Sequence, residues 1–144
     1  MYLIDTNVIS EARRGTREAV AWLRAVQADS LCLSVITLGE IAKGIALKGR
    51  HDRAAAVPLT AWLHELRDNF ASRILPITDA IALEWGRIAA ERPRGDADGL
   101  IAATAIVHDL ILVTRNVGDF EDTRVSLVNP WDPASAAHSD LRCR

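Results

Sequence analysis

The stretch that decides the fold of this chain lies at its start: Leu3-Ile4-Asp5-Thr6-Asn7-Val8-Ile9-Ser10. Residues 2–4 are bulky β-formers and the run stops on a carboxylate followed by small polar residues, a pattern that predicts a short buried strand. In parallel α/β sheets, ligands bind beyond the carboxyl ends of the strands, which is the position expected for Asp5. The alternative is that Asp5, helped by Thr6, only caps a helix that starts near Asn7.

The rest of the chain alternates short apolar runs with amphipathic segments. The expected further strands are 31–34, 74–77, 110–114 and 125–128, and the expected helices are 7–11, 17–27, 37–47, 53–72, 79–92 and 98–108. Within 53–72 we expect a fresh helix start near Pro58, because proline is tolerated in a first turn but not in a helix interior. This alternation predicts an α/β fold, with a parallel sheet of four to five strands and helices on both faces.

Length and composition favour a single domain. A chain of 144 residues can bury one full core, and we expect a domain over 1–132 followed by a flexible C-terminal tail, 133–144. Hydrophobic residues make up 49% and charged residues 25%, as in ordinary globular proteins, and no apolar run has the length of a membrane span. Met1 leads directly into the first strand without a secretory leader, so we expect a cytoplasmic protein.

Net charge and cysteine content bear on nucleic-acid binding, zinc sites and disulfide bonds. The formal net charge of −2 provides no general attraction for nucleic acid, so contacts with RNA or DNA would rest on local basic patches and metal ions. Cys32 and Cys143 have neither zinc spacing nor a disulfide framework, and we expect both to be reduced and structural.

Polar residues converge on the edge of the sheet where Asp5 is expected. They follow the second strand, open the helix before the fourth strand, or follow the fourth strand directly: Glu40, Asp98, Asn116 and Asp119. By contrast, Asp109 ends a helix at the opposite edge. Several carboxylates close together repel one another unless cations lie among them. Oxygen ligands without histidine or cysteine suit Mg²⁺ or Mn²⁺ rather than zinc.

Each of these residues also has a purely structural interpretation. The spacing from Thr37 to Glu40 fits a capping box, in which the glutamate reaches back to a backbone N–H. Asp98 is favoured at the positive end of its helix dipole, and Asp96 is a candidate N-cap. The two residues after the fourth strand suit an ordinary turn. None of these interpretations explains why all the residues gather at one edge, so we favour the metal site.

The chain also resembles a known family, in five segments spread in order over residues 2–131: Leu-Ile-Asp-Thr-Asn-Val-Ile-Ser-Glu at the start, Ser34-Val-Ile-Thr-Leu-Gly-Glu40, Ala97-Asp98-Gly-Leu-Ile-Ala-Ala-Thr-Ala105, Val113-Thr-Arg-Asn116-Val-Gly-Asp-Phe120 and Asn129-Pro-Trp131. They are similar to those of PIN-domain proteins, and most of all to the VapC/FitB-like toxins of bacterial toxin–antitoxin pairs. The resemblance implies a PIN fold and Mg²⁺-dependent ribonuclease activity.

For the site, the resemblance implies that Asp5, Glu40 and Asp98 are the family's acids. Its fourth acidic position falls on Asn116, which lacks a negative charge, and Asp119 is the candidate to supply it. For partners, it implies a homodimer held by a cognate antitoxin, whose C-terminal segment occupies the acidic groove within a larger toxin–antitoxin complex.

The mechanism that follows is metal-assisted hydrolysis of an RNA phosphodiester, in which the ion lowers the pKa of a bound water and orients it. We expect Asp5 and Asp98 to be direct ligands, and Glu40 to be either a third ligand or the group that orients the water. Arg115 and Lys43 are candidates for contacting phosphate, and the alternative for both is an ordinary surface charge.

Three rival functions are considered at this point. A haloacid-dehalogenase-like phosphohydrolase also begins with a strand that ends in Asp, but it needs a second Asp two residues later, where this chain has Asn7. A receiver-type phosphoacceptor would need Lys where this chain has Arg115. The other rival is a non-catalytic PIN-like binding module, which the missing acid at Asn116 favours and the three retained acids oppose.

Overall fold

The protein is built on a parallel five-stranded sheet with β1 at its centre. A computed structural model describes residues 1–136. The sheet order is β3-β2-β1-β4-β5, and all neighbouring strands pair in parallel. The strands are β1 (Tyr2–Ile4), β2 (Leu31–Ser34), β3 (Ile74–Leu75), β4 (Ile111–Val113) and β5 (Ser126–Val128). The α/β parallel fold predicted from the sequence is confirmed.

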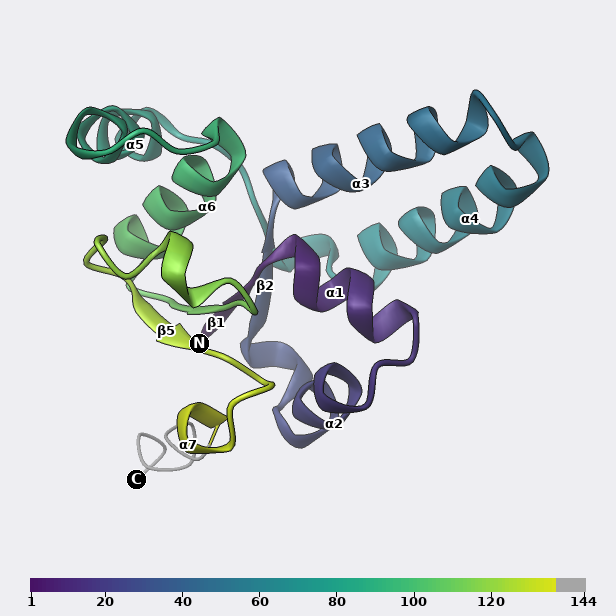
Figure 1. Ribbon diagram of the computed structural model, residues 1–144, viewed down its shortest axis with the longest axis horizontal. Helices are drawn as coiled ribbons and strands as arrows, with labels where there is room; N and C mark the ends of the chain where they lie inside the picture. The colour runs from purple at the N-terminus through teal and green to yellow at the C-terminus, as the bar shows by residue number, and fades with distance from the viewer. Residues whose placement is uncertain (137–144) are drawn as a thin grey trace.

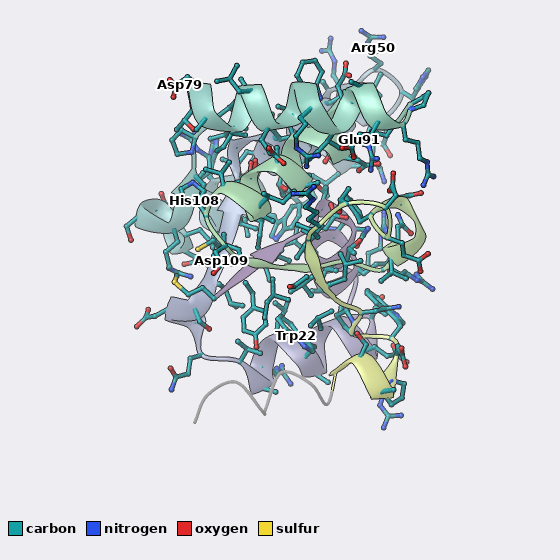
Figure 2. All side chains as sticks on the ribbon, turned by 90° about the vertical axis from the view of Figure 1, so that its left-hand side faces the viewer. Trp22, Arg50, Asp79, Glu91, His108 and Asp109 are labelled. Carbon is teal, nitrogen blue, oxygen red and sulfur yellow. The ribbon has the colours of Figure 1, made fainter. Side chains whose placement is uncertain are left out.

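Helices cover both faces of this sheet (Figure 1). They are α1 (Thr6–Arg13), α2 (Arg17–Ala25), α3 (Val35–Gly49), α4 (Arg53–Asn69), α5 (Asp79–Glu91), α6 (Asp96–Val107) and α7 (Pro133–Ala136), with 3₁₀ turns η1 (Ala28–Ser30), η2 (Ala71–Arg73) and η3 (Val117–Asp119). Helices α1 to α4 pack against one face, and α5 and α6 against the other. Figure 2 shows the two layers apart, with Trp22 of α2 on one side and α5, from Asp79 to Glu91, on the other.

Side chains of the central strand alternate between these layers. Tyr2 and Ile4 join the core beneath α1 to α4. There the rings of Tyr2 and Trp22 pack edge to face, with 5.1 Å between their centroids. Leu3 joins the core beneath α5 and α6, together with the buried free thiol of Cys32. Each large apolar side chain buried in this way stabilises the fold by about 1.5–3 kcal/mol, so β1 is fixed by both layers.

The prediction that the fourth helix starts afresh at Pro58 was wrong. Helix α4 begins at Arg53, because Asp52 caps it by accepting a hydrogen bond from the Ala55 N–H at 3.0 Å. Pro58 lies inside the helix at an exposed position, and it lacks the N–H that would otherwise bond to the carbonyl of Ala54, which is also an exposed residue.

The tail expected from residue 133 begins with an ordered helical turn. Pro133 occupies the first position of α7, where its missing N–H costs nothing, and Asp132 accepts from the Ala134 N–H at 3.1 Å. The Ser135 hydroxyl accepts from the Asn129 N–H at 2.9 Å, which ties α7 to the end of β5. Residues 137–144, including Cys143, lie outside the described residues. In the part that is described, no helix is both long and apolar enough to cross a membrane.

The strand register brings the ends of β1, β2 and β4 to one edge. Leu3 is level with Cys32 on one side and with Leu112 on the other. Past β1, the Asp5 N–H still donates to the Val113 carbonyl at 2.9 Å. Helix α6 starts at this edge and runs to the opposite one, where Asp109 turns the chain with a positive φ of 52°. The predicted placement of Asp5, and of Asp109 away from it, is confirmed.

Candidate active site

Asp5 is fixed at the carboxyl end of β1 by donors on both of its oxygens. Oδ1 accepts from the Thr6 N–H at 2.8 Å, and Oδ2 accepts from the Thr114 hydroxyl at 2.8 Å and from Nδ2 of Asn7 at 3.1 Å. The residue is only 4% exposed. Asp5 is also the N-cap of α1, as the structural interpretation expected, and its role as a metal ligand stays a prediction.

The environment of Asp5 makes its carboxyl a weaker acid than usual. Burial raises the pKa to about 6, and the negative charges of Asp98 and Glu40 add to this increase. The hydrogen bonds from Thr114 and Thr6 act in the opposite direction. A buried carboxylate facing two further carboxylates gains from a nearby cation, which would restore its charged form.

Glu40 faces Asp5 from the second turn of α3. The helix begins at Val35, where Ser34 caps it by accepting from the Ile36 N–H at 3.0 Å. The capping-box interpretation of Glu40 was therefore wrong, and because the helix begins at Val35 and not at the expected residue 37, Glu40 lies in its second turn and not in its first. Glu40 Oε1 instead accepts from the Thr6 hydroxyl at 2.6 Å.

Asp98 is the third residue of α6 and the other half-buried acid of the site. Gly95 is the N-cap, so Asp96 is the first helical residue and not the cap that the sequence indicated. Burial raises the pKa of Asp98, and the charges of Asp119 and Glu40 raise it further, whereas Arg94 lowers it. The negative charges of Asp5, Glu40, Asp98 and Asp119 thus share one region at the edge of the sheet.

The two candidates for the fourth acidic position, Asn116 and Asp119, lie in the loop after β4 and have different contacts. Asn116 donates its N–H to the Thr114 hydroxyl at 3.1 Å, but its carboxamide makes no hydrogen bond to any residue in 1–136. Asp119 lies close enough to Asp98 to raise its pKa. Its carbonyl accepts from Arg94 Nη1 at 3.1 Å, and Arg94 also pairs with Asp122 at 2.6 Å. These contacts hold the η3 turn against the start of α6.

The donor set fits a hydrated hard cation. Among residues 1–136, no three carboxylate, imidazole or thiolate groups lie close enough together to hold one ion by themselves. The charges of Glu40 and Asp98 nevertheless raise the pKa of Asp5, that of Glu40 raises the pKa of Asp98, and all three residues offer oxygen. Mg²⁺ retains several waters and binds through one or two carboxylates, so spaced oxygen donors of this kind suit it.

The two residues predicted to contact phosphate have different surroundings. The guanidinium of Arg115 lies over the ring of Trp131, 4.8 Å from its centroid, and Lys43 is exposed on α3. Their role in binding substrate stays a prediction. Thr6, Asn7 and Thr114 hold the acids in place and were missed, although Thr6 and Asn7 directly follow Asp5 in the sequence.

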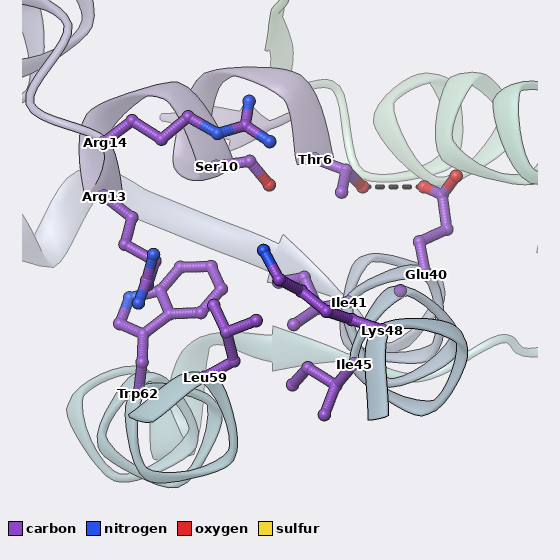
Figure 3. Close-up of a pocket in the computed structure, with 11 residues that line it drawn as sticks. Thr6, Ser10, Arg13, Arg14, Glu40, Ile41, Ile45, Lys48, Leu59 and Trp62 are labelled. Carbon is purple, nitrogen blue, oxygen red and sulfur yellow. Dashed lines mark hydrogen bonds between the residues drawn. The ribbon is translucent and has the colours of Figure 1, made fainter. Parts of the chain in front are cut away.

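A pocket of about 260 Å³ begins beside Glu40 and Thr6. We call it the α1–α3–α4 pocket, because those helices supply its walls: Thr6, Ser10, Arg13, Arg14, Glu40, Ile41, Gly44, Ile45, Lys48, Leu59 and Trp62. Figure 3 shows Glu40 and Thr6 on one side, Arg13 and Arg14 on the other, and the side chain of Lys48 reaching between them. Its basic residues had not been singled out from the sequence.

Comparison with known proteins identifies the family of the chain. The PIN domain family matches residues 2–125, which include the three central acids and Asp119. The chain belongs to the PIN-domain family. Within the family, this PIN domain is similar to "VapC ribonuclease Y4jK" of Sinorhizobium fredii, with 33% identity over 93% of this chain and 100% of the relative. It is also similar to "Toxin FitB" of Neisseria gonorrhoeae, with 37% identity over 91% and 99%.

Solved structures agree with this assignment. The crystal structure of FitAcB from Neisseria gonorrhoeae matches the PIN domain with a TM-score of 0.83 and 36% identity, over 91% of this chain and 99% of that chain. The match spans the sheet and both helical layers. The resemblance to the VapC/FitB group that the five sequence segments indicated is confirmed.

Proposed function

We propose that this PIN domain is the toxin of a toxin–antitoxin pair, a Mg²⁺-dependent endoribonuclease with Mn²⁺ as an alternative ion. The observation that carries the proposal is the shared electrostatic region of Asp5, Glu40 and Asp98 at the carboxyl edge of the sheet. The printed names of relatives support it, since several are called ribonucleases, among them "Ribonuclease VapC10" of Mycobacterium tuberculosis at 33% identity.

Asp5 and Asp98 are the residues that would hold the ion. When bound, the ion would lower the pKa of a coordinated water and offset charge on the phosphate oxygens. Glu40 has one oxygen engaged by Thr6, which leaves the other free to accept a proton from the attacking water. Asp119 supplies the fourth negative charge in this proposal, since its carboxylate acts on Asp98.

The proposed partners are a cognate antitoxin and a second copy of the chain. A structure of FitAB bound to an IR36 DNA fragment matches this PIN domain with 34% identity and a TM-score of 0.82. A toxin–antitoxin complex from Klebsiella pneumoniae matches it with 26% identity and a TM-score of 0.70. These relatives support a complex with an antitoxin, and we propose that the antitoxin covers the acidic groove and blocks cleavage.

The rival functions can be distinguished by the role of Asn7 and by whether RNA is cleaved. Asn7 stands where a haloacid-dehalogenase-like enzyme has its second Asp, and here its side chain donates a hydrogen bond to Asp5. That contact and the family both favour the nuclease. A non-catalytic binding module would bind RNA without cleaving it, which the following experiment detects.

The test uses the purified chain, free of antitoxin, with a fluorogenic RNA in Mg²⁺, in Mn²⁺ and in EDTA. We expect cleavage with either ion, none in EDTA, and loss of cleavage in Asp98→Asn. Asp109→Asn is the matched control, because it removes the same charge at the opposite edge and Asn tolerates the positive φ there. Binding without cleavage under all conditions would overturn the nuclease proposal.

A further inference from the structure

The α1–α3–α4 pocket is continuous with the acidic site but carries the opposite charge. Three cationic side chains line it, Arg13, Arg14 and Lys48, in a chain whose net charge is −2. At its near end, Glu40 belongs both to the pocket and to the acidic site. A strand whose scissile phosphate lies at the acids would therefore enter a basic pocket directly beside them.

Two of the three cations are available to an anionic ligand. Arg14 is engaged by Glu11 at 2.8 Å. Arg13 and Lys48 form no ion pair within residues 1–136. Figure 3 shows both directed into the space between α1 and α4.

Trp62 holds Arg13 in position for such a contact. The guanidinium lies over the indole ring, 5.4 Å from its centroid, which limits the conformations of a long side chain before any ligand binds. Beside it, Leu59, Ile41 and Ile45 provide an apolar wall. Cations next to an apolar and aromatic wall are the combination that binds single-stranded nucleic acid, in which phosphates are neutralised and bases stack.

We propose that the α1–α3–α4 pocket binds the nucleotide that neighbours the scissile phosphate in single-stranded RNA, with its phosphate at Arg13 and Lys48. The proposal rests on the proposed function, since it takes RNA as the substrate. The pocket lies just below the range of about 300–1,000 Å³ typical of small-molecule sites, a size that suits one nucleotide of an extended strand. A peptide of the antitoxin is the competing occupant. The free cations and their position beside the acids favour the phosphate.

The test compares Lys48→Gln and Arg13→Gln with Arg17→Gln, an exposed arginine on the next helix that does not line the pocket. Affinity for a fluorescein-labelled eight-nucleotide RNA is measured by anisotropy in the Asp98→Asn background, where cleavage is prevented. We expect the two pocket variants to weaken binding about fivefold. Each should lower the slope of log affinity against log salt by about 0.7, as for one lost phosphate contact on a single strand.

Cleavage by the otherwise wild-type chain gives the second readout. The pocket variants should raise KM for RNA by a similar factor and leave kcat nearly unchanged, whereas Arg17→Gln should change neither. Equal RNA affinity in all three variants, with cleavage intact, overturns the inference and leaves the proposed function standing. Unchanged RNA affinity combined with weaker antitoxin binding also overturns it, and assigns the pocket to the peptide. Failure of the parent chain to bind or cleave RNA removes both proposals.

Discussion

The hydroxyl of Thr6 donates a 2.6 Å hydrogen bond to Oε1 of Glu40, which joins the first residue of α1 to the second turn of α3. The same hydroxyl lies 3.2 Å from that of Thr37, which is fully buried. Because both helices start from the carboxyl edge of the sheet, this bond fixes the direction of the Glu40 carboxylate relative to Asp5.

Removing that hydroxyl tests whether Thr6 positions Glu40. We expect Thr6→Val to lower kcat for RNA about tenfold with little change in KM, because a lost hydrogen bond of about 1.4 kcal/mol would affect only the orientation of Glu40. Thr6→Ser keeps the hydroxyl and should restore most of the activity. Equal kcat in Thr6→Val and Thr6→Ser would show that Glu40 needs no such support.

Burial of Asp5 makes the stability of the metal-free protein depend on pH. The pKa is about 6 in the folded chain against an ordinary value of 3.8, so the folded state binds the proton more tightly. The resulting stability is fully present below pH 3.8 and is lost as the pH rises through 6, by about 3 kcal/mol for about two pKa units.

Asp5→Asn removes that titration. Urea denaturation in EDTA should show the variant to be more stable than wild type at pH 7.5, by about 1–3 kcal/mol, and similar to it near pH 4. Cleavage of RNA should be abolished. A variant that is less stable at pH 7.5 and still cleaves RNA would make Asp5 a helix cap and no more.

Gly99 allows α6 to approach α5 next to Asp98. A Cβ at this position would lie 2.9 Å from Cδ1 of Trp85, so Gly99→Ala forces either the indole or the helix to move. We expect a loss of about 1–3 kcal/mol in the free energy of unfolding and lower cleavage activity through displacement of Asp98. Gly86→Ala on α5 is the matched control, because it meets nothing within 4 Å and should be neutral or stabilising. Similar losses in both variants would contradict this account.

Substitutions at Asn116 and at Asp119 should differ in their effect on the Mg²⁺ concentration needed for half-maximal cleavage. Asp119 acts on the pKa of Asp98, so Asp119→Asn should raise the Mg²⁺ concentration for half-maximal cleavage several-fold, since affinity for hard cations falls with ligand charge. Asn116→Asp should change it little. The reverse pattern in a Mg²⁺ titration would assign the fourth position to Asn116.

The sequence was sufficient for the position of Asp5, because a short apolar run followed by a carboxylate is a local signal. It was misleading for Glu40, since the capping-box spacing from Thr37 competes with Ser34, whose hydroxyl is the actual cap. The point at which β2 passes into α3 decides that competition: the strand ends at Ser34 and the helix begins at Val35, so Thr37 already lies inside the helix, which a local pattern does not reveal.

The basic pocket could not be predicted from the sequence for a related reason. Lys43 and Lys48 lie on the same helix, but a separation of five residues turns them about 140° apart around its axis. Which of the two faces α1 depends on how α3 packs against α4, and that packing is tertiary. Only Lys43 was proposed from the sequence, and the structure places Lys48 in the pocket instead.

The most direct test of the central claim is the chemistry of the RNA ends. The purified chain cleaves a defined RNA in Mg²⁺ and ¹⁸O-labelled water, and mass spectrometry identifies the new termini. Attack by a metal-activated water predicts a terminal phosphate carrying one ¹⁸O, and no cleavage in EDTA. Cleavage that persists in EDTA and leaves a 2′,3′-cyclic phosphate without ¹⁸O would contradict the account, because the nucleophile would then be the RNA's own 2′-hydroxyl.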